Sequence, residues 1–332
     1  MEKIKKSELQ LGNRIGGGRF SDVYEASHPT IKHKLALKIT EPDDDRPPHN
    51  SRNELKILMK LLNHTDHGGK QKYCGNVVRL LAWFQDSIEI GFVFPLYQYD
   101  LNKVMKIYSS TKSAFMPDGS IQRISKNTLK ESQIEQIFVG LLKGLQFIHS
   151  NEIIHRDINP NNIMFDSLET IEPIIIDFGI SYDLPNNHGL ESPTEKITDV
   201  ATSYYKAPEL LMSVRNYSDK VDIWSLGVIL MLLSSRNGKL PYDEDAQHSD
   251  LALISSIFNT FGSPSEDWQE VKSSRSFQAM NTNFFKKDPK PLSVILPLIT
   301  NPALIDVFKK MMVFESSERI SASDALQKIT TA

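Results

Sequence analysis

The sequence of 332 residues is poor in cysteine and has no long hydrophobic run. Its one cysteine, Cys74, excludes an intramolecular disulfide and predicts a reducing compartment, the cytoplasm or the nucleus. The most apolar stretch, Trp224 to Leu233, is interrupted by Ser225 and Gly227 and is shorter than the roughly 20 apolar residues that span a bilayer. We therefore expect a buried helix there and no membrane partner.

A strong excess of charge of one sign is also missing. The chain has 38 basic and 41 acidic residues and a net charge of −3, whereas dedicated nucleic-acid binders usually carry a basic excess, so we expect no nucleic-acid partner. No CxxC or HExxH pattern supports a structural zinc site or a zinc protease. What remains is an ordinary globular composition, with 40% hydrophobic and 24% charged residues, in a chain long enough to bury a large core.

The first part of the chain has the pattern of a β-sheet with one helix. Strand signals flank a glycine run between residues 10 and 26, and further strands are predicted at Lys34–Thr40, Val77–Phe84 and Ile88–Phe94. Apolar residues at helical spacing predict one helix at Asn53–Leu62.

After Pro95 the pattern changes to helix. A stripe of apolar residues with a period near 3.6 predicts a helix with one buried face at Leu129–His149. The polar segment Ser109–Asn127 is predicted to be a mobile insertion. The expected architecture is α+β, with a small β-rich part, a hinge near residues 95–98 and a larger helical part.

Several short patterns in the chain could carry chemistry. Ile15-Gly-Gly-Gly-Arg-Phe-Ser-Asp-Val23 lies between two predicted strands, where glycine amides can approach phosphates, although the same residues could form a plain hairpin turn. Lys38 on the next strand could reach the phosphates of a nucleotide if a carboxylate such as Glu54 held it. Both side chains could instead be solvated surface residues.

Two later patterns place carboxylates and amides after buried elements. His155-Arg-Asp-Ile-Asn-Pro-Asn-Asn162 follows the long helix and offers an aspartate that can accept a hydroxyl proton and an asparagine that can hold a metal. Ile174-Ile-Ile-Asp177-Phe178-Gly179 delivers an aspartate at the end of a buried strand, and Mg²⁺ prefers such oxygen ligands, shared with phosphates. Ala207-Pro208-Glu209 and Asp222-Ile-Trp-Ser-Leu-Gly227 complete the series.

These patterns, in this order and at these spacings, are typical of protein kinases. Over roughly residues 9–328 the chain resembles a eukaryotic protein kinase. The resemblance implies one bilobal domain over residues 1–332, with a β-rich N-lobe (1–96) that covers ATP and a larger α-helical C-lobe (97–332) that carries catalysis and substrate binding. It implies an ATP site formed by Ile15, Gly16, Gly17, Gly18, Val23, Ala36, Lys38, Phe94, Leu96 and Tyr97.

The resemblance also assigns chemical roles. Lys38 and Glu54 would form the ion pair that orients the phosphates of ATP. Asp157 would be the catalytic base, and Asn162 and Asp177 would hold Mg²⁺. Other residues would have positioning roles. Leu58, His155 and Phe178 would link the two lobes, and Asp222 would hold the catalytic loop from below. Glu209 and Arg319 would form an ion pair.

One position departs from the family pattern. Two residues after the catalytic aspartate, serine/threonine kinases normally carry a lysine that neutralises the γ-phosphate, but this chain has Asn159 in the catalytic loop. A cation lost beside the transferring phosphoryl group can slow transfer by orders of magnitude. A catalytically inactive scaffold therefore stays open as an alternative, although the lysine, the base and the metal ligands of the family are all present.

Other segments indicate a place within the family. Thr202-Ser-Tyr-Tyr-Lys-Ala-Pro-Glu209 resembles the matching stretch of cyclin-dependent kinases, but the helix around Glu54 has no PSTAIRE-like cyclin-binding sequence. The segments Arg46–Glu54 and Pro289–Pro297, together with the catalytic loop, look like the monomeric CDK-activating kinases of fungi. In that group the residue that matches Asn159 is also unusual.

That likeness implies a serine/threonine protein kinase that uses ATP and Mg²⁺ to phosphorylate the activation-loop threonine of a cyclin-dependent kinase. It also implies a monomer that works without a cyclin and without phosphorylation of its own activation loop. A proline-directed kinase of the same superfamily with other substrates is the second alternative.

Arg156 bears on the activation loop because an arginine at this position normally grips a phosphate on that loop. The loop offers Thr194 and Thr198 as phosphate acceptors, and Glu195 and Asp199 as ready anions. One hypothesis is that an acidic residue satisfies Arg156 permanently. The alternative is that these loop charges are simply solvated.

Overall fold

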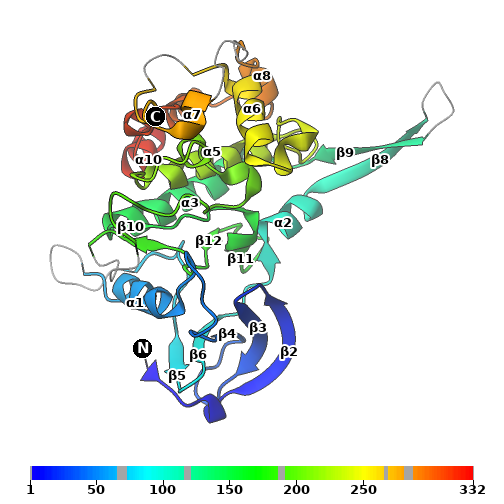
Figure 1. Cartoon of the computed structure of the whole chain (residues 1–332). Helices are drawn as coiled ribbons and strands as arrows, with labels where there is room; N and C mark the ends of the chain where they lie inside the picture. Colours follow the sequence, from blue (N-terminus) through cyan, green and yellow to red (C-terminus); the bar gives the residue numbers. More distant parts are fainter. Residues whose placement is uncertain are drawn as a thin grey trace.

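The computed structural model describes residues 2–65, 73–115, 121–185, 191–264, 268–279 and 287–331. A β-sheet with one helix beside it forms the smaller lobe, and a larger helical lobe follows (Figure 1). The predicted α+β class and two-lobed fold are confirmed. The sheet ends at Pro95, next to the predicted limit between residues 1–96 and 97–332, and the position of that limit stays a prediction.

Six strands form the sheet of the small lobe in the order β1-β5-β6-β4-β3-β2. Because side chains alternate along a strand, Leu35 and Leu37 of β4 are buried beneath the sheet while Ala36 and Lys38 face the other way. The register places Val23 opposite Lys38 and Ala36 opposite Phe94. The strands are β1 (Glu2–Lys3), β2 (Gln10–Gly17), β3 (Ser21–Ser27), β4 (Leu35–Thr40), β5 (Ala82–Gln85) and β6 (Ile90–Pro95), with a short 3₁₀ turn η1 (Lys6–Glu8).

Helix α1 (Ser51–Leu62) lies beside this sheet and links it to the large lobe (Figure 1). Asn50 begins the helix as its N-cap, because its side chain accepts a hydrogen bond from the amide of Asn53 at 2.7 Å. The amide of Asn50 donates to the carbonyl of Gly179 at 3.0 Å, and the Asn53 side chain donates to the carbonyl of Ser181 at 3.2 Å. These bonds fix the helix relative to the large lobe and so position its buried residue Glu54.

The strand predicted at Val77–Phe84 is shorter in the structure, where only Ala82–Gln85 pairs within the sheet. Val77 and Val78 instead contact β12 (Ile174–Ile175) of the large lobe, and the Val78 amide donates to the Ile175 carbonyl at 2.8 Å. Both valines are buried, so the apolar pattern was produced by packing against the other lobe.

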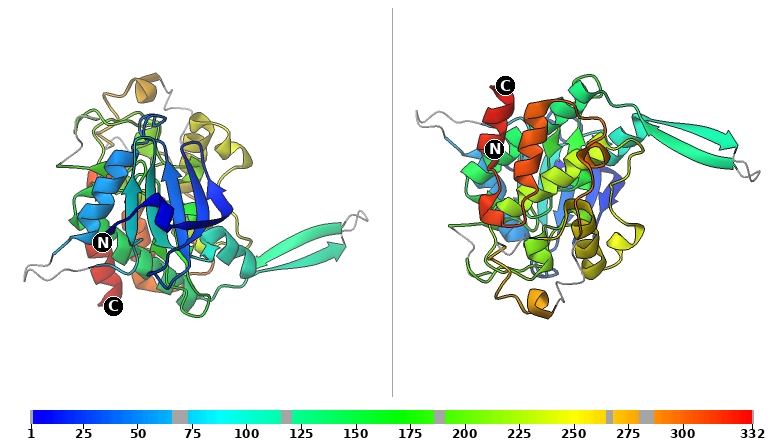
Figure 2. Two further views of the ribbon diagram at one scale, coloured as in Figure 1. Left: turned by 90° about the horizontal axis from the view of Figure 1, so that it is seen from below. Right: turned by 90° about the horizontal axis from the view of Figure 1, so that it is seen from above.

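The insertion Ser109–Asn127, predicted to be mobile, contains two paired antiparallel strands that the sequence did not predict. Strands β8 (Ser109–Phe115) and β9 (Ile121–Asn127) project from the large lobe as an arm (Figures 1 and 2). Its base is anchored because the Asn127 side chain donates to the carbonyls of Leu233 and Ser235, each at 2.8 Å.

The large lobe is built around two helices, α3 (Glu131–Ser150) and α5 (Lys220–Ser234). The apolar stretch predicted to be a buried helix lies in α5, and every residue from Val221 to Ser234 is buried. No helix in the described ranges combines the length and the apolar character needed to cross a membrane. The other helices are α2 (Leu101–Ile107), α4 (Pro208–Leu211), α6 (Asp250–Phe261), α7 (Arg275–Ala279), α8 (Leu292–Ile295), α9 (Pro302–Met311) and α10 (Ala322–Thr330).

Short strands and turns line the side of the large lobe that faces the sheet (Figure 1). They place the predicted catalytic loop and the segment after it directly below the small lobe. They are β7 (Tyr99–Asp100), β10 (Ile153–Ile154), β11 (Ile163–Phe165) and β13 (Tyr182–Asp183), and the 3₁₀ turn η2 (Pro160–Asn162). Three further 3₁₀ turns, η3 (Ser203–Tyr205), η4 (Glu244–Gln247) and η6 (Ser316–Glu318), pack against α5 or α6.

Candidate active site

The glycine run forms the turn between β2 and β3 at the edge of the space between the lobes. A Cβ atom on Gly17 would lie 2.5 Å from the Arg14 guanidinium, and the φ angle of 152° also disfavours a side chain, so the fold requires glycine there. Gly18 has open space around its Cα, and Gly16 has only Val23 nearby. Packing does not demand glycine at these two positions, so their small size leaves room for a ligand to approach the backbone.

Three charged side chains from distant parts of the chain meet behind this turn. The Lys38 ammonium donates to both carboxylate oxygens of Glu54, at 2.7 and 3.0 Å, and to Asp177 at 2.8 Å. Lys38 comes from the sheet, Glu54 from α1 and Asp177 from the loop after β12. The structure thus brings together the predicted ion pair and one predicted metal ligand.

The shared lysine sets the protonation of this cluster. Burial opposes the charged form of Lys38, but the two carboxylates outweigh that effect and raise its pKa. Burial works against the anion of Asp177 as well, yet the adjacent ammonium lowers the pKa of this carboxyl to about 2. For Glu54 the attraction of Lys38 does not outweigh the effect of burial, and burial raises the pKa of this carboxyl to about 7. Asp177 therefore keeps its charge over the whole physiological range.

The catalytic loop is held from below by Asp222 at the start of α5. Its two carboxylate oxygens accept hydrogen bonds from the amides of His155 and Arg156, both at 2.8 Å. Arg156 and Asp177 have positive φ angles of 69° and 66°, a backbone conformation that costs on the order of 1 kcal/mol or more in a residue with a side chain. The His155 ring packs edge-on against Phe178 at 5.0 Å, which joins the two strained segments.

Asp157 is oriented by two neighbours. One carboxylate oxygen accepts from the Asn162 amide group at 2.8 Å, and the other accepts from the hydroxyl of Thr202 at 2.7 Å. The base is therefore already placed to accept a hydrogen bond from an alcohol. The contact from Thr202 was not anticipated from the sequence, where this residue served only to indicate the subgroup.

Asn162 and Asp177 fit the binding of a magnesium ion. The amide hydrogens of Asn162 are directed at the carboxylate and the carbonyl of Asp157, which leaves its carbonyl oxygen as the atom that could bind a metal. No group of three or more His, Cys, Asp or Glu side chains in the described part of the chain is arranged so that it could hold a metal ion. Two oxygen ligands from protein suit Mg²⁺, which takes its other ligands from water and phosphate.

Asn159 is buried and cannot act as the missing cation. Its side-chain oxygen caps η2 by accepting from the Asn161 amide at 2.9 Å, and its amide group donates to the carbonyl of Asp157 and the hydroxyl of Thr202. The residue is 2% exposed. It fixes the shape of the catalytic loop, and the loop contributes no positive charge there.

The predicted adenine-binding residues lie on one side of the sheet and on the segment that follows it. Phe94, the last residue but one of β6, stacks on Phe92 at 6.2 Å, and the amide of Leu96 donates to the carbonyl of Lys34 at 3.0 Å. Tyr97 is partly buried against the core of the large lobe. Val23 of β3 lies opposite Lys38 of β4, and Ile15 is an exposed residue of β2. These positions agree with an adenine site at the hinge, and the role of each residue stays a prediction.

An acidic residue does pair with Arg156, but it is neither of the two named from the sequence. The carboxylate of Glu191 accepts from the Arg156 guanidinium at 2.8 Å and from the Ile197 amide at 2.8 Å. Glu195 instead pairs with Arg215. Asp199, 95% exposed, accepts from Lys206 at 3.2 Å.

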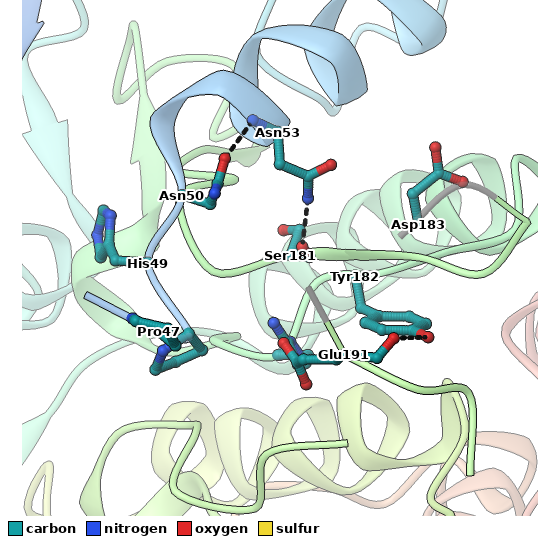
Figure 3. A pocket seen from close by; sticks show the side chains of 10 residues that line it. Pro47, His49, Asn50, Asn53, Ser181, Tyr182, Asp183 and Glu191 are labelled. Carbon is teal, nitrogen blue, oxygen red and sulfur yellow. Dashed lines mark hydrogen bonds and ion pairs between the residues drawn. The ribbon is translucent and has the colours of Figure 1, made fainter. Parts of the chain in front are cut away.

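The pair between Arg156 and Glu191 is shielded from solvent. The side chains are 1% and 7% exposed, and the Tyr182 hydroxyl donates to the Glu191 carbonyl at 3.3 Å. Figure 3 shows Glu191 beside Tyr182 at one end of a small pocket, with Asn53 of α1 reaching Ser181 at the other. An internal carboxylate thus occupies the place where a loop phosphate would bind Arg156.

The large lobe contains a second buried ion pair, between Glu209 and Arg319. The two bonds between carboxylate and guanidinium are 2.6 and 2.7 Å long, and neither side chain has exposed surface. This pair joins the segment after the activation loop to the end of η6, as expected from the sequence, and its part is structural.

Comparison with known proteins decides the family. The family described as "Protein kinase domain" matches residues 9–329. The chain belongs to the protein kinase family. The kinase is 35% identical over 267 residues to the serine/threonine-protein kinase CAK1 of Saccharomyces cerevisiae. The aligned region covers 74% of this chain and 73% of that protein. It is 29% identical over 322 residues to cyclin-dependent kinase 20 of Danio rerio, with 96% and 82% of the two chains covered.

The kinase is thus a serine/threonine protein kinase of the cyclin-dependent-kinase-like group, similar to CAK1, as the motifs indicated. Protein kinases of this family use ATP, typically with Mg²⁺, and act on a protein substrate. When bound, the metal neutralises charge on the phosphates, and Asn162 and Asp177 are the residues that would hold it. Lys38 would bind the α- and β-phosphates, and Asp157 would accept the proton of the substrate hydroxyl.

Proposed function

We propose that this kinase phosphorylates the activation-loop threonine of a cyclin-dependent kinase, as a monomer and without a cyclin, in the cytoplasm or nucleus. The pairing of Glu191 with Arg156 carries the proposal. An internal carboxylate at Arg156 would let this kinase work without first being phosphorylated, which suits an enzyme that switches on other kinases. The similarity to CAK1 over most of both chains supports the same conclusion.

The proposed reaction is an in-line displacement at the γ-phosphorus. The threonine oxygen of the substrate attacks the phosphorus, the bond to the oxygen that bridges the β- and γ-phosphates breaks, and ADP leaves. Asp157 takes the hydroxyl proton, for which its carboxylate is already oriented by Asn162. Lys38, fixed between Glu54 and Asp177, keeps the departing diphosphate in place.

The test is transfer of radiolabelled phosphate from ATP to a purified cyclin-dependent kinase, with and without its cyclin. Asp157→Asn is the matched control, because it keeps the size of the side chain and removes the base. We expect labelling by the wild type in both conditions and a loss of several orders of magnitude in the variant. Equal labelling by the wild type and the variant would show that the proposed mechanism is wrong.

Two other outcomes would point to the alternatives. Transfer to a proline-directed peptide but not to the cyclin-dependent kinase would favour a kinase with other substrates. Absence of transfer to any protein, with ATP binding intact, would favour a scaffold. Sedimentation velocity of the active enzyme checks the monomer, and a second copy in the active species would contradict it.

A further inference from the structure

A cavity of about 320 Å³ lies beside Asp157, between the two lobes. Its upper wall comes from Arg19 and Phe20 in the turn after β2, and from residues 46–49 before α1. Its lower wall comes from Asp157 and residues 199–202. It therefore adjoins the carboxylate that takes the proton of the substrate hydroxyl.

The upper wall is held together across two segments. The Phe20 and His49 rings lie 4.9 Å apart, so the tip of the glycine turn rests on the segment before α1. The amide of His49 donates to the carbonyl of Arg46 at 2.8 Å, which folds that segment into a turn. Figure 3 shows Pro47 and His49 on the stretch of chain that leads into the helix. Arg19 and Arg46 are thus brought to the same side of the cavity.

Most cations near the reaction site are already paired. Lys38 bonds to two carboxylates, and Arg156 bonds to Glu191. Lys206 pairs with both Asp199 and Asp250, at 3.2 Å each.

Arg19 and Arg46 differ from these cations. No carboxylate within the described residues forms an ion pair with either one. The Arg46 guanidinium donates only to the backbone carbonyls of Asp43 and Asp45, and the Arg19 guanidinium lies 5.5 Å from the Phe20 ring. Neither guanidinium is therefore held by a carboxylate, although Asp43, Asp44 and Asp45 directly precede Arg46 in the chain.

We propose that Arg19 and Arg46 form an oxyanion site beside Asp157, which takes up the charge of the phosphoryl group during transfer. Phosphoryl transfer needs positive charge around the equatorial oxygens, and Asn159 supplies none. Guanidinium groups suit this task because their planar N–H groups match the geometry of phosphate oxygens. An acidic side chain next to the acceptor hydroxyl of the protein substrate would offer the same oxyanion chemistry, and the experiment separates the two sources.

The exposure of the two arginine side chains sets the expected loss of rate when either one is removed. Removing one oxyanion donor from an enclosed site costs about 10²–10³ in rate, but both arginines are exposed to solvent and their charges are partly screened. We expect a roughly tenfold lower kcat for Arg19→Gln or Arg46→Gln, and a roughly hundredfold lower kcat for the double variant.

The experiment measures kcat and KM in two reactions that need no cyclin-dependent kinase. One is hydrolysis of MgATP without a protein substrate. The other is phosphorylation of two peptides that differ by a glutamate beside the acceptor threonine. The control is Arg52→Gln, because this arginine of α1 is 58% exposed and does not line the cavity. The proposal rests on kinase chemistry alone, so its failure is distinct from failure of the proposed substrate.

The outcomes are separable. A lower kcat in both reactions, with the control unchanged, supports binding of the transferring phosphoryl group. A higher KM for the glutamate peptide alone identifies the substrate as the source of the oxyanion. Unchanged constants in both reactions, or an equal loss in Arg52→Gln, would overturn the site.

A rescue experiment tests the compensation directly. Asn159→Lys restores the family's usual cation, so it should recover about tenfold in kcat when added to the Arg19→Gln/Arg46→Gln variant. In the wild-type background the same change should bring no gain in kcat, since the charge is already supplied and the hydrogen bonds of Asn159 that shape the loop are lost. An equal gain in both backgrounds would mean that the arginines do not replace the missing lysine.

Discussion

Glu191 holds the activation segment in place of a phosphate, and the change Glu191→Gln tests that function. Glutamine keeps the shape and the acceptor oxygen of glutamate but removes its charge. The carboxylate now accepts two hydrogen bonds of 2.8 Å, from the Arg156 guanidinium and from the Ile197 amide. The substitution would leave the 1% exposed Arg156 side chain without a counter-ion.

The structure sets the size of the effect. Removing one partner of a buried ion pair costs about 3–5 kcal/mol, and the oxygen that glutamine keeps lowers this to about 3 kcal/mol. Each 1.4 kcal/mol is a factor of ten in an equilibrium, so the ordered activation segment should lose about a hundredfold in population relative to disordered forms. We expect kcat/KM for the protein substrate to fall by up to that factor.

The matched control is Glu195→Gln, four residues away. Glu195 pairs with Arg215, and both side chains are more than half exposed, at 59% and 54%, so this pair contributes about 0–1 kcal/mol. The kcat/KM of the control variant for the protein substrate should stay within about threefold of the wild-type value. Wild-type enzyme should also remain active after phosphatase treatment, because neither Thr194 nor Thr198 would need to carry a phosphate.

Two results would refute this reasoning. Full activity in Glu191→Gln would show that the ion pair does not hold the segment. Loss of wild-type activity after phosphatase treatment would show that a phosphate is needed despite the carboxylate.

Three further predictions concern stability, pH and the arm. Glu209→Ala strands the buried Arg319 charge and should lower Tm by about 10 °C in calorimetry; a shift below about 3 °C would contradict a stabilising pair. The pKa of Glu54 is raised to about 7, so the carboxylate is ionised above that pH and neutral below it. Hence kcat/KM for ATP should fall as pH drops through 7. The Glu54→Gln variant should have a low kcat/KM at every pH, without this fall near pH 7. Replacing residues 111–125 by Asn-Gly should move Tm by less than about 2 °C, because the arm packs on itself.

Much of the site was predictable because the family fixes the spacing of its chemical residues. Lys38, Glu54 and Asp177 come from three segments up to 139 residues apart. The family pattern predicted the pair of Lys38 with Glu54, whereas the contact of Lys38 with Asp177 was not predicted. Glu191 was not predictable, since the choice among several loop acids depends on the path of the backbone. Only folding brings this carboxylate to Arg156 and sends Glu195 to solvent.

The fold was predictable where burial follows the period of the element. Along α1 and α3 the apolar stripe marks the buried face, and both helices were expected close to their observed limits. Among the side chains of the arm that the structure describes, only Asn127 at its base is buried, so the sequence of the arm gave no alternating strand signal. At Val77 and Val78 the burial comes from the other lobe, and an apolar run was therefore mistaken for a strand.

The arm has a consequence for how copies of the chain meet each other. Its strands β8 and β9 pair with one another, and in the described residues neither pairs with a third strand, so each has one free edge. Free edges are templates for strand addition by a second molecule. The two strands carry Lys112, Arg123 and Lys126 and no acidic residue, so two arms that approached edge to edge would repel. High salt would screen this repulsion, and the tendency of the protein to self-associate should rise with ionic strength.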